Sequence, residues 1–516
     1  MVNFGPRPAD KLSRISPGIL LCIALAYLFA ANIIWISRDG RPPFFDMAYH
    51  QAKAMNIYDA IHSRGISGLR EIPHLTGFYP PLFHSVIAIF YALFGKSIHS
   101  AMLANLPAIA ILLFATYGLG KRLMTPFAAA TAAVLANFFP LMLWLSRETL
   151  IDYWLAAFVT LAMLCLFRTG SFSKRSESVL FGVVCGLGML TKWTFPLFVA
   201  LPAVWTARKN WKNAAIAALT ASAVSATWYA SQWKAIESFF NINKAGGVAE
   251  GDPLKLSFQS LVFYVRALEG YQLFLPLFVL FVAGVVFLIR NFSPAWIPVV
   301  LWIAGGWFSL LWFQNKDPRY TVPLLPAVAL ISAFILQNRR LGIAALACLL
   351  LFQHHLVSFG IGNLPERIIL LKGIEGPLSW DWNLYTQTYF QLLGPPARED
   401  WKIEQVLSQV AEVGGLKVRL GIVPSIPRFD PEAFEFYAAL RGYNITVTRL
   451  WYFDEKAMAG QDCILVSEGD QGYAAFYSKD LDRINHYIMD RPDRYRLADR
   501  FAIPGGQTIR LYRLKP

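Results

Sequence analysis

The fold of this chain is decided where an apolar run gives way to the stretch Arg41-Pro42-Pro43-Phe44-Phe45-Asp46-Met47-Ala48-Tyr49-His50. The run before it, residues 17–37, is long enough to cross a bilayer, because a membrane helix needs roughly 20 apolar residues. Asp46 therefore follows a membrane crossing. Its simplest role is to cap a helix that starts after Pro42-Pro43. Phe44-Phe45, however, indicates a helix lying against the membrane, where a carboxylate needs a functional explanation.

The composition indicates a polytopic membrane protein. Of the 516 residues, 56% are hydrophobic and 16% are charged, which is too apolar for an ordinary soluble protein. The net charge of +14 does not indicate a nucleic-acid partner, since the basic residues lie in short loops between apolar runs, as the positive-inside rule describes. Residues 17–37 are long for a signal-peptide core and lack a convincing cleavage site, so we expect a retained first span, with a signal peptide cleaved near Ala24-Leu25-Ala26 as the alternative. The five cysteines predict no disulfide framework.

The basic loops orient the predicted spans. If all of them are cytoplasmic, an even number of crossings separates each loop from the next. This parity predicts that residues 81–95 form a short helix at the outer interface instead of a span. It also predicts a broken hairpin around Thr191-Lys192-Trp193, with Lys192 near its outer tip. The basic loops used are the amino terminus, 121–122, 168–175, 208–212, 290 and 339–340.

The resulting fold class is a polytopic α-helical membrane protein with about eleven crossings and amphipathic juxtamembrane helices. We expect the amino terminus in the cytoplasm. Residues 38–80 and 232–271 are expected to form the two large outer loops. Besides the two short legs around Lys192, the predicted spans are 17–37, 98–119, 125–145, 150–167, 213–231, 272–290, 294–313, 321–337 and 341–358.

Two domains are expected, a membrane domain over residues 1–358 and an extracytoplasmic α/β domain over residues 359–516. After residue 358 charged residues become frequent and long apolar runs end. The tail contains neither a Gly-rich phosphate loop nor a metal-ligand spacing. Its alternation and its turn signals predict a helix at 431–440 and short strands at 417–423, 445–450, 463–466 and 508–512.

Three charged residues follow the span predicted at 125–145. Glu148 and Asp152 are four apart, so on a helix they would share one face. Like carboxylates at this spacing repel each other unless a positive group lies between them, which indicates a cation, a general base or a hydrogen-bonded acceptor. An ordinary solvated turn, with Arg147 as an ion-pair partner, is the alternative. A metal bridge lacks support, because no histidine or second acidic pair has suitable spacing.

Two cations are expected at the same outer face. Lys192 interrupts an apolar stretch, where an unpaired ammonium would cost on the order of several kcal/mol, so it either binds an anion or extends to the lipid headgroups. Arg319 offers a planar fork that suits phosphate, or it anchors its turn to headgroups. His354 and His355, in the last span, are expected to serve packing or interface anchoring rather than ligation.

Six short pieces follow one another along the chain: Asp46, Tyr79-Pro80-Pro81-Leu82, 118–123, 147–152, 186–192, and Arg319-Tyr320 before Pro323 and Pro326. In this order, they resemble the GT-C superfamily of polytopic glycosyltransferases, in particular the group with protein O-mannosyltransferases and the lipid A aminoarabinose transferase. The likeness covers roughly residues 15–340. Two positions depart from the group's pattern: Met47 stands where members often have a second acid, and Tyr79 where aminoarabinose transferases commonly have lysine.

By this resemblance the chain is an enzyme, a hexosyl- or pentosyltransferase that moves a sugar from a polyprenyl-phosphate donor to a lipid, glycan or protein acceptor. The resemblance implies one inverting displacement with Asp46 as general base. Lys192 and Arg319, with Arg147, would stabilise the departing phosphate. No metal ligand is implied, and a divalent cation stays open as an assisting group.

The same resemblance implies further contacts with the substrates. Asp152, with Glu148 beside it, would orient hydroxyl groups of the acceptor or the sugar. The remaining expected substrate-binding residues are Tyr79, Tyr320, His50 and His84.

The expected location is the cell inner membrane, with the site on the non-cytoplasmic face. Two other classes of function stay open. A transporter or flippase of lipid-linked saccharides would carry inverted internal repeats with polar residues at mid-membrane, and the sequence shows no such repeat. A non-catalytic membrane scaffold would leave Lys192 and the paired acids without a role.

Overall fold

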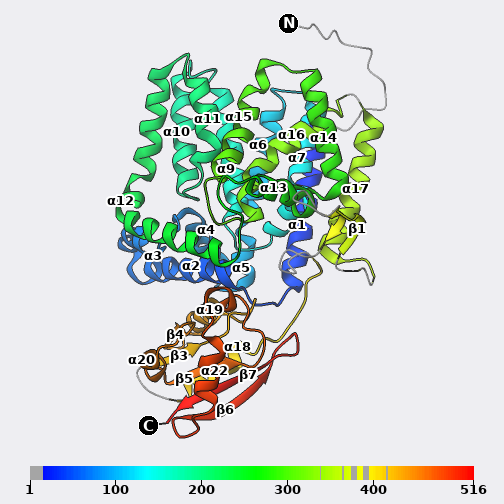
Figure 1. The fold of residues 1–516 in the computed structure, drawn as a ribbon. Helices are drawn as coiled ribbons and strands as arrows, with labels where there is room; N and C mark the ends of the chain where they lie inside the picture. The colour runs from blue at the N-terminus through cyan, green and yellow to red at the C-terminus, as the bar shows by residue number, and fades with distance from the viewer. Residues whose placement is uncertain are drawn as a thin grey trace.

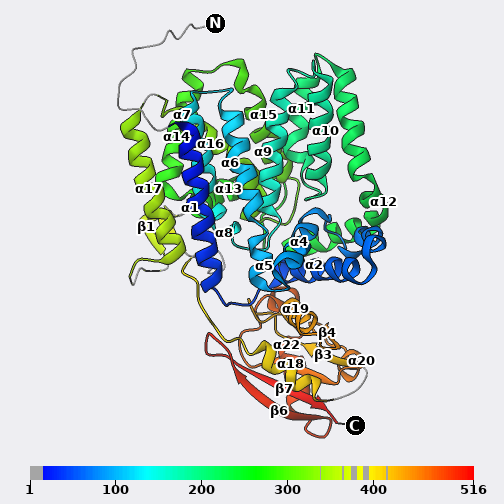
Figure 2. The ribbon, with the colours of Figure 1, turned by 180° about the vertical axis from the view of Figure 1, so that it is seen from behind.

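The computed structural model describes residues 16–337, 339–362, 365, 367–373, 381–386, 394–413 and 417–515. It consists of an upright helical bundle and a smaller C-terminal α/β domain at one end of that bundle, with a layer of short helices between them (Figure 1). Helix α1 (Pro17–Arg38) runs along the bundle (Figure 2). It begins with the Ser16 hydroxyl accepting the N–H of Ile19 and with Pro17 at the first position, as helices commonly do.

The bundle is a multi-pass membrane structure. Within the described residues, four helical segments are long and apolar enough to cross a membrane: Pro17–Arg38, Ile98–Gly120, Phe258–Arg290 and Leu341–Phe359. Shorter apolar helices pack among them. The predicted number of about eleven crossings stays a prediction.

Small side chains let the centre of the bundle pack closely. Helix α7 is rich in alanine, and nearly all of its residues are buried between its neighbours. After α1, the bundle consists of α5 (Ile98–Leu103), α6 (Leu106–Gly120), α7 (Pro126–Phe138), α8 (Pro140–Leu145), α9 (Asp152–Arg168), α10 (Arg175–Met189), α11 (Pro196–Ala207), α12 (Trp211–Ala249), α13 (Phe258–Ala267), η2 (Leu268–Leu273), α14 (Phe274–Arg290), η3 (Pro294–Trp296), α15 (Ile297–Leu310), η4 (Pro318–Leu324), α16 (Leu325–Phe334) and α17 (Arg340–Phe359).

The layer between the bundle and the C-terminal domain contains α2 (Phe45–Arg64), η1 (Gly65–Glu71), α3 (Ile72–Leu75) and α4 (Leu82–Phe94). Helix α4 is the short helix expected at 81–95, and it packs against α2 in this layer. Helix α12 extends beyond residue 231 into the segment expected as the second outer loop, so the first part of that segment is helical. Its second half bends toward the layer (Figure 1), and a chain at that depth satisfies its backbone groups best as a helix.

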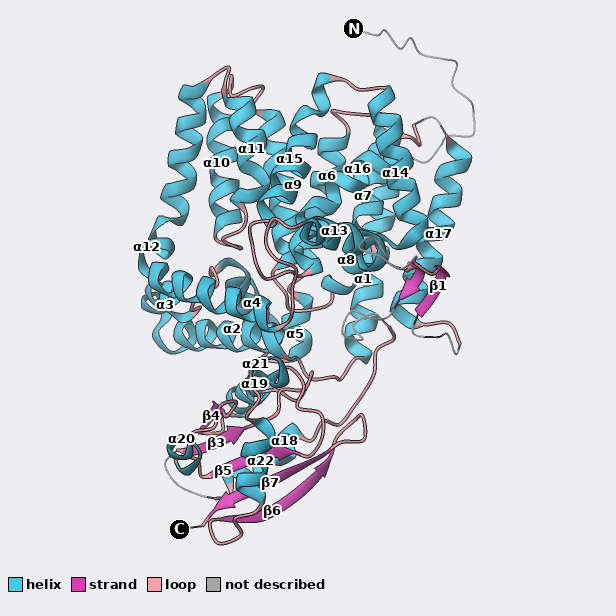
Figure 3. Ribbon diagram, in the orientation of Figure 1, coloured by secondary structure: helices cyan, strands magenta, loops and turns pink. Residues whose placement is uncertain are grey.

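The C-terminal domain is built on a five-stranded sheet (Figure 3) in the order β4-β3-β5-β7-β6. Strand β3 runs parallel to β4 and β5, while β7 runs antiparallel to β5 and β6. The strands are β3 (Val418–Ile422), β4 (Ile445–Arg449), β5 (Cys463–Ser467), β6 (Tyr495–Ala502) and β7 (Thr508–Leu514), and the helices are α18 (Ile403–Ala411), α19 (Pro431–Arg441), α20 (Glu455–Ala459), α21 (Ala474–Tyr477) and α22 (Leu481–Met489).

A second, two-stranded sheet belongs with the bundle instead. Strands β1 (Arg367–Leu371) and β2 (Trp382–Thr386) pair antiparallel. Trp382 packs against Phe278 of α14, with ring centroids 5.9 Å apart, and Tyr385 against Phe274 at 6.0 Å. The α/β domain expected for the tail therefore exists, but this first part of the tail packs on the membrane helices.

Candidate active site

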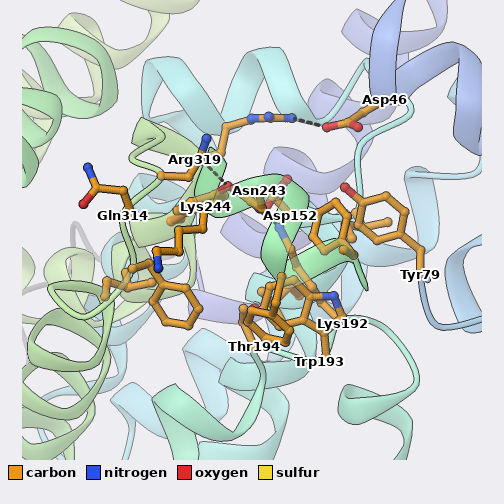
Figure 4. Close-up of a pocket in the computed structure, with 18 of the residues that line it drawn as sticks. Asp46, Tyr79, Asp152, Lys192, Trp193, Thr194, Asn243, Lys244, Gln314 and Arg319 are labelled. Carbon is orange, nitrogen blue, oxygen red and sulfur yellow. Dashed lines mark hydrogen bonds and ion pairs between the residues drawn. The ribbon is translucent and has the colours of Figure 1, made fainter. Parts of the chain in front are cut away.

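A cavity of about 390 Å³ lies where the bundle meets the layer of short helices. This volume is in the range of sites that bind small molecules. Polar side chains from α2, α9, the turn between α10 and α11, and η4 enter the cavity, and aromatic side chains form much of its wall (Figure 4). The residues predicted from the sequence that line it are Asp46, His50, Tyr79, Asp152, Lys192, Arg319 and Tyr320.

Lys192 and Asp152 form a tight, buried ion pair at this cavity. Asp152 is the first residue of α9, and Lys192 lies in the turn between α10 and α11. The Lys192 Nζ atom donates to Asp152 Oδ1 at 2.7 Å, and both side chains are less than 10% exposed. The ammonium also lies 5.4 Å from the centre of the Tyr320 ring. Lys192 thus meets an anion, as expected, because a buried charge without a partner is costly.

Asp46 and Arg319 form a looser and more exposed pair. Their closest atoms, Asp46 Oδ2 and Arg319 Nη1, are 3.6 Å apart, and the Asp46 side chain is 41% exposed. Figure 4 shows Arg319 extending toward Asp46. Arg319 is anchored on its other side, where Nε and Nη2 donate to Asp317 Oδ2 at 2.9 and 2.7 Å. The guanidinium is therefore fixed in place, while the Asp46 carboxylate keeps room for another partner.

Two histidines lie at the cavity wall and directly behind it. His50 lines the cavity, and its Nδ1 lies 2.9 Å from Nε2 of the buried His84, which does not line it. The Tyr79 ring packs against His50 at 4.7 Å. Burial, with Lys192 and Arg319 nearby, holds the pKa of His50 well below its usual range. A neutral imidazole here can donate or accept one hydrogen bond at the cavity wall.

Arg147 and Glu148 do not line the cavity. The segment between α8 and α9 is a turn and α9 begins only at Asp152, so Glu148 and Asp152 do not share the face that they would have shared on one helix. Glu148 accepts the indole N–H of Trp144 at 3.2 Å, and burial raises the pKa of its carboxyl to about 7.

The guanidinium of Arg147 is enclosed by helices α1 and α17. It donates to Asn32 Oδ1 at 2.8 Å and to the Ser358 hydroxyl at 2.7 Å, and it lies 3.3 Å from Nε2 of His354. The other ring nitrogen of His354 is 3.0 Å from the Tyr27 hydroxyl. His354 is therefore part of a packing contact between helices, as expected for it.

The second half of α12 supplies a wall of the cavity that was not expected from the sequence. Phe239, Phe240, Asn243 and Lys244 line the cavity from that helix, and Phe240 packs on Trp193 at 4.6 Å. The signal was the aromatic pair followed by polar residues in the segment expected to be a loop. The remaining lining residues that were not anticipated include Thr194, Lys255, Leu310, Trp312, Phe313, Gln314 and Asn315.

A glycine lets this wall close. A Cβ on Gly247 of α12 would lie 2.5 Å from the Asn315 Cα, so only glycine lets the end of α12 lie directly against that turn.

In the part of the chain that the structure describes, no group of three or more His, Cys, Asp or Glu residues could hold a metal ion.

Comparison with protein families and with curated proteins finds related sequences. The family model of dolichyl-phosphate-mannose-protein mannosyltransferases matches residues 79–233. The undecaprenyl phosphate-alpha-4-amino-4-deoxy-L-arabinose arabinosyl transferase of Pseudomonas aeruginosa (strain UCBPP-PA14) is 29% identical over 174 residues, which cover 30% of this chain. The match spans 31% of the length of that relative.

Comparison with solved structures shows the fold over nearly the whole chain. ArnT from Cupriavidus metallidurans, solved both in the apo state and bound to undecaprenyl phosphate, is similar with a TM-score of 0.58 at 14% identity, covering 96% of this chain and 97% of that one. The oligosaccharyltransferase AglB from Archaeoglobus fulgidus, solved with an inhibitory peptide and a dolichol-phosphate, is similar with a TM-score of 0.51 at 13% identity, covering 84% and 65%. The predicted resemblance to the GT-C superfamily and the GT-C-like fold are confirmed.

Proposed function

We propose that this chain is a membrane glycosyltransferase that moves a sugar from a polyprenyl-phosphate donor to an acceptor hydroxyl in the cavity at Asp46. The observation that carries the proposal is that one cavity holds an accessible carboxylate and two anchored cations beside an aromatic wall. The relatives support this proposal. The matching family model and the curated relative are named for transferases of sugars linked to a polyprenyl phosphate. Two of the similar structures were solved with undecaprenyl phosphate or a dolichol-phosphate bound.

In the proposed reaction, the acceptor oxygen forms a bond to the anomeric carbon while the bond from that carbon to the donor phosphate oxygen breaks. Asp46 takes the proton of the acceptor hydroxyl, and the electron pair of the broken bond stays on the polyprenyl phosphate. Because the displacement has one step, the anomeric configuration inverts. Arg319 and Lys192 stabilise the phosphate charge that develops, which preorganised cations in a partly desolvated site do well.

The other groups of the cavity position the two substrates. Asp152 holds the Lys192 ammonium in place and offers its second carboxylate oxygen to a sugar hydroxyl. Tyr79, Tyr320 and His50 supply hydrogen-bonding groups at the wall. Aromatic rings such as Trp193 and Phe239 pack against the apolar faces of a sugar and against prenyl units. Arg147 and Glu148, which are enclosed elsewhere, have no part in this proposal.

We further propose that the cavity opens on the non-cytoplasmic side of a cell inner membrane. The basic loops of the chain support this. They join the helices at the end of the bundle opposite the cavity (Figure 1), and the positive-inside rule assigns that end to the cytoplasm. The C-terminal domain then lies outside the cytoplasm. The acceptor in this proposal is a lipid, glycan or protein hydroxyl presented at that surface.

The proposal is tested by reconstituting the full chain in liposomes with a panel of polyprenyl-phosphate sugars and candidate acceptor extracts. The expected result is acceptor-dependent release of free polyprenyl phosphate from one donor, with product of inverted anomeric configuration by NMR. Liposomes without protein are the control. The proposal is overturned if no donor is consumed while labelled donor lipid crosses the bilayer, which is the behaviour of a flippase.

A further inference from the structure

Helix α2 has no cap of its own. Its N-cap position is Phe44, whose side chain makes no cap hydrogen bond, although the first N–H groups of a helix need acceptors. The N–H of Phe45 instead donates to Asp430 Oδ1 in the C-terminal domain, at 3.2 Å. The same oxygen accepts the N–H groups of Glu432 and Ala433 at the start of α19, at 3.0 and 3.2 Å. One buried carboxyl group therefore caps two helices, one in each part of the molecule.

A second contact holds the unusual backbone at the start of α2. Phe45 has φ of +45°, a conformation that bulky residues rarely adopt and that persists only where the surroundings enforce it. The Tyr473 ring packs edge-on against the Phe45 ring, with centroids 4.8 Å apart. Tyr473 is fixed in turn, because its N–H donates to the Ser425 carbonyl at 2.7 Å. Gly472 permits this close approach, since it has φ of +61° and a Cβ there would lie 2.1 Å from the Ser425 oxygen.

A third contact fixes the chain just before α2. The Nη1 group of Arg428 donates to the Pro42 carbonyl oxygen at 3.0 Å. Its guanidinium also lies 5.1 Å from the centre of the Phe44 ring. We name these three residues of the C-terminal domain, Arg428, Asp430 and Tyr473, the α2 clamp.

The clamp bears directly on Asp46, the residue after Phe45. The Asp46 side chain is 41% exposed and reaches Arg319 only at 3.6 Å, so its location depends on the backbone of the first turn of α2. We propose that the α2 clamp is a positioning device, through which the C-terminal domain sets the place of the Asp46 carboxylate in the cavity. The inference rests on the proposed function, in which Asp46 takes the acceptor proton, and a shift of about 1 Å in such a group can cost about 100-fold in rate.

The first experiment removes the shared cap and measures transfer and donor binding separately. Asp430→Ala is expected to lower kcat by about 10- to 100-fold. The dissociation constant for polyprenyl phosphate is expected to change less than about twofold, because Lys192 and Arg319 are not on α2. Tyr473→Ala, which leaves the caps of both helices intact, is expected to lower kcat in the same direction and covers the case in which Asp430→Ala does not fold.

Two further variants separate positioning from general destabilisation. Burial, with Glu432 beside it, raises the pKa of Asp430 well above its usual range, so the neutral Asp430→Asn keeps Oδ1 as an acceptor and is expected to restore kcat. Asp454 caps α20 by accepting two N–H groups, at 2.9 and 3.2 Å, without contacting α2. Asp454→Ala removes the same kind of cap and is expected to leave kcat unchanged. The proposal is overturned if Asp454→Ala loses as much kcat as Asp430→Ala, or if Asp430→Asn does not recover.

Hydrogen exchange gives a readout that does not depend on transfer. The peptide covering residues 42–50 is expected to exchange faster in Asp430→Ala than in the wild type, and at the wild-type rate in Asp454→Ala. If the wild type transfers no sugar but this exchange pattern appears, the proposed function fails and the clamp stands. If exchange in this peptide is the same in all three proteins, the clamp does not hold α2 and the inference is overturned.

Discussion

The two sides of one turn, between α8 and α9, use their charged residues in different ways. On one side Asp152 faces the cavity and holds Lys192 at 2.7 Å. On the other side Arg147 is enclosed by Asn32, Ser358 and His354, far enough from the cavity that it does not line it. All of these side chains are buried, so burial does not distinguish them. What distinguishes them is whether an open volume lies beside the charge.

This difference separates a functional role from a structural one. A buried ion pair at a cavity can exchange contacts with a ligand, whereas a guanidinium enclosed by protein groups can only hold those groups together. We therefore expect substitutions on the Asp152 side to change transfer and substitutions on the Arg147 side to change stability.

Of the substitutions that test the two sides of this turn, Lys192→Met is expected to have the largest effect. It removes the cation at the cavity and leaves the Asp152 carboxylate buried without its partner. Transfer should fall by about 100-fold or more, and the free energy of unfolding by about 3–5 kcal/mol. Transfer assays and thermal unfolding of the same preparation measure the two quantities. In the double variant Lys192→Met/Asp152→Asn, stability should return while transfer does not; recovery of transfer would show that the charge of Lys192 is dispensable.

Arg147→Met is expected to act on stability alone. The substitution leaves the Ser358 hydroxyl without its buried donor and leaves Asn32 Oδ1 with only the Ser146 hydroxyl at 3.3 Å, at a cost of about 2–3 kcal/mol. Because Arg147 does not line the cavity, kcat measured per folded molecule should stay within about twofold of the wild type. Thermal unfolding and active-site titration check this pair of outcomes. A large loss of kcat at unchanged stability would show that Arg147 takes part in transfer.

Glu148→Gln should produce a smaller, pH-dependent gain in stability. Burial raises the pKa of Glu148 from 4.5 to about 7. Between these values the folded protein holds a proton that the unfolded chain has released, so the wild type loses stability as pH rises from about 4.5 to 7. Glutamine has no charged form, so the variant should gain about 1–3 kcal/mol over the wild type above pH 7 and nothing near pH 4. Unfolding curves at pH 4.5 and pH 8 test this, and an equal difference at both would contradict it.

Much of the fold and of the site could be predicted because the apolar runs, the alternation of residues and the positions of the basic loops can be read from the sequence. The parity of the basic loops predicted α4 as a short helix, and the alternation of apolar and polar residues predicted β3 in the tail. Topology brought Asp46, Lys192 and Arg319 to one end of the bundle, as the parity of the basic loops predicts.

The remainder could not be predicted, because it depends on contacts across the chain. The spacing of Glu148 and Asp152 indicated one face only if the segment was helical, and the helix starts at Asp152. The wall from α12 lies in a polar segment whose helix is stabilised by its place in the layer, not by its own apolar pattern. The cap of α2 comes from Asp430, which is 385 residues away in the sequence.

In the proposed function, Asp46 is the general base of sugar transfer. The most direct test is a single-turnover measurement at saturating donor, comparing Asp46→Asn with Asp59→Asn, a matched change on the same helix at an exposed residue that pairs with Lys96 at 2.5 Å. Asp46→Asn is expected to slow transfer by about 100- to 10,000-fold with unchanged affinity for polyprenyl phosphate, while Asp59→Asn is expected to transfer as the wild type does. Transfer by Asp46→Asn at the wild-type rate would show that Asp46 is not the general base, and another group of the cavity would then have to take the acceptor proton.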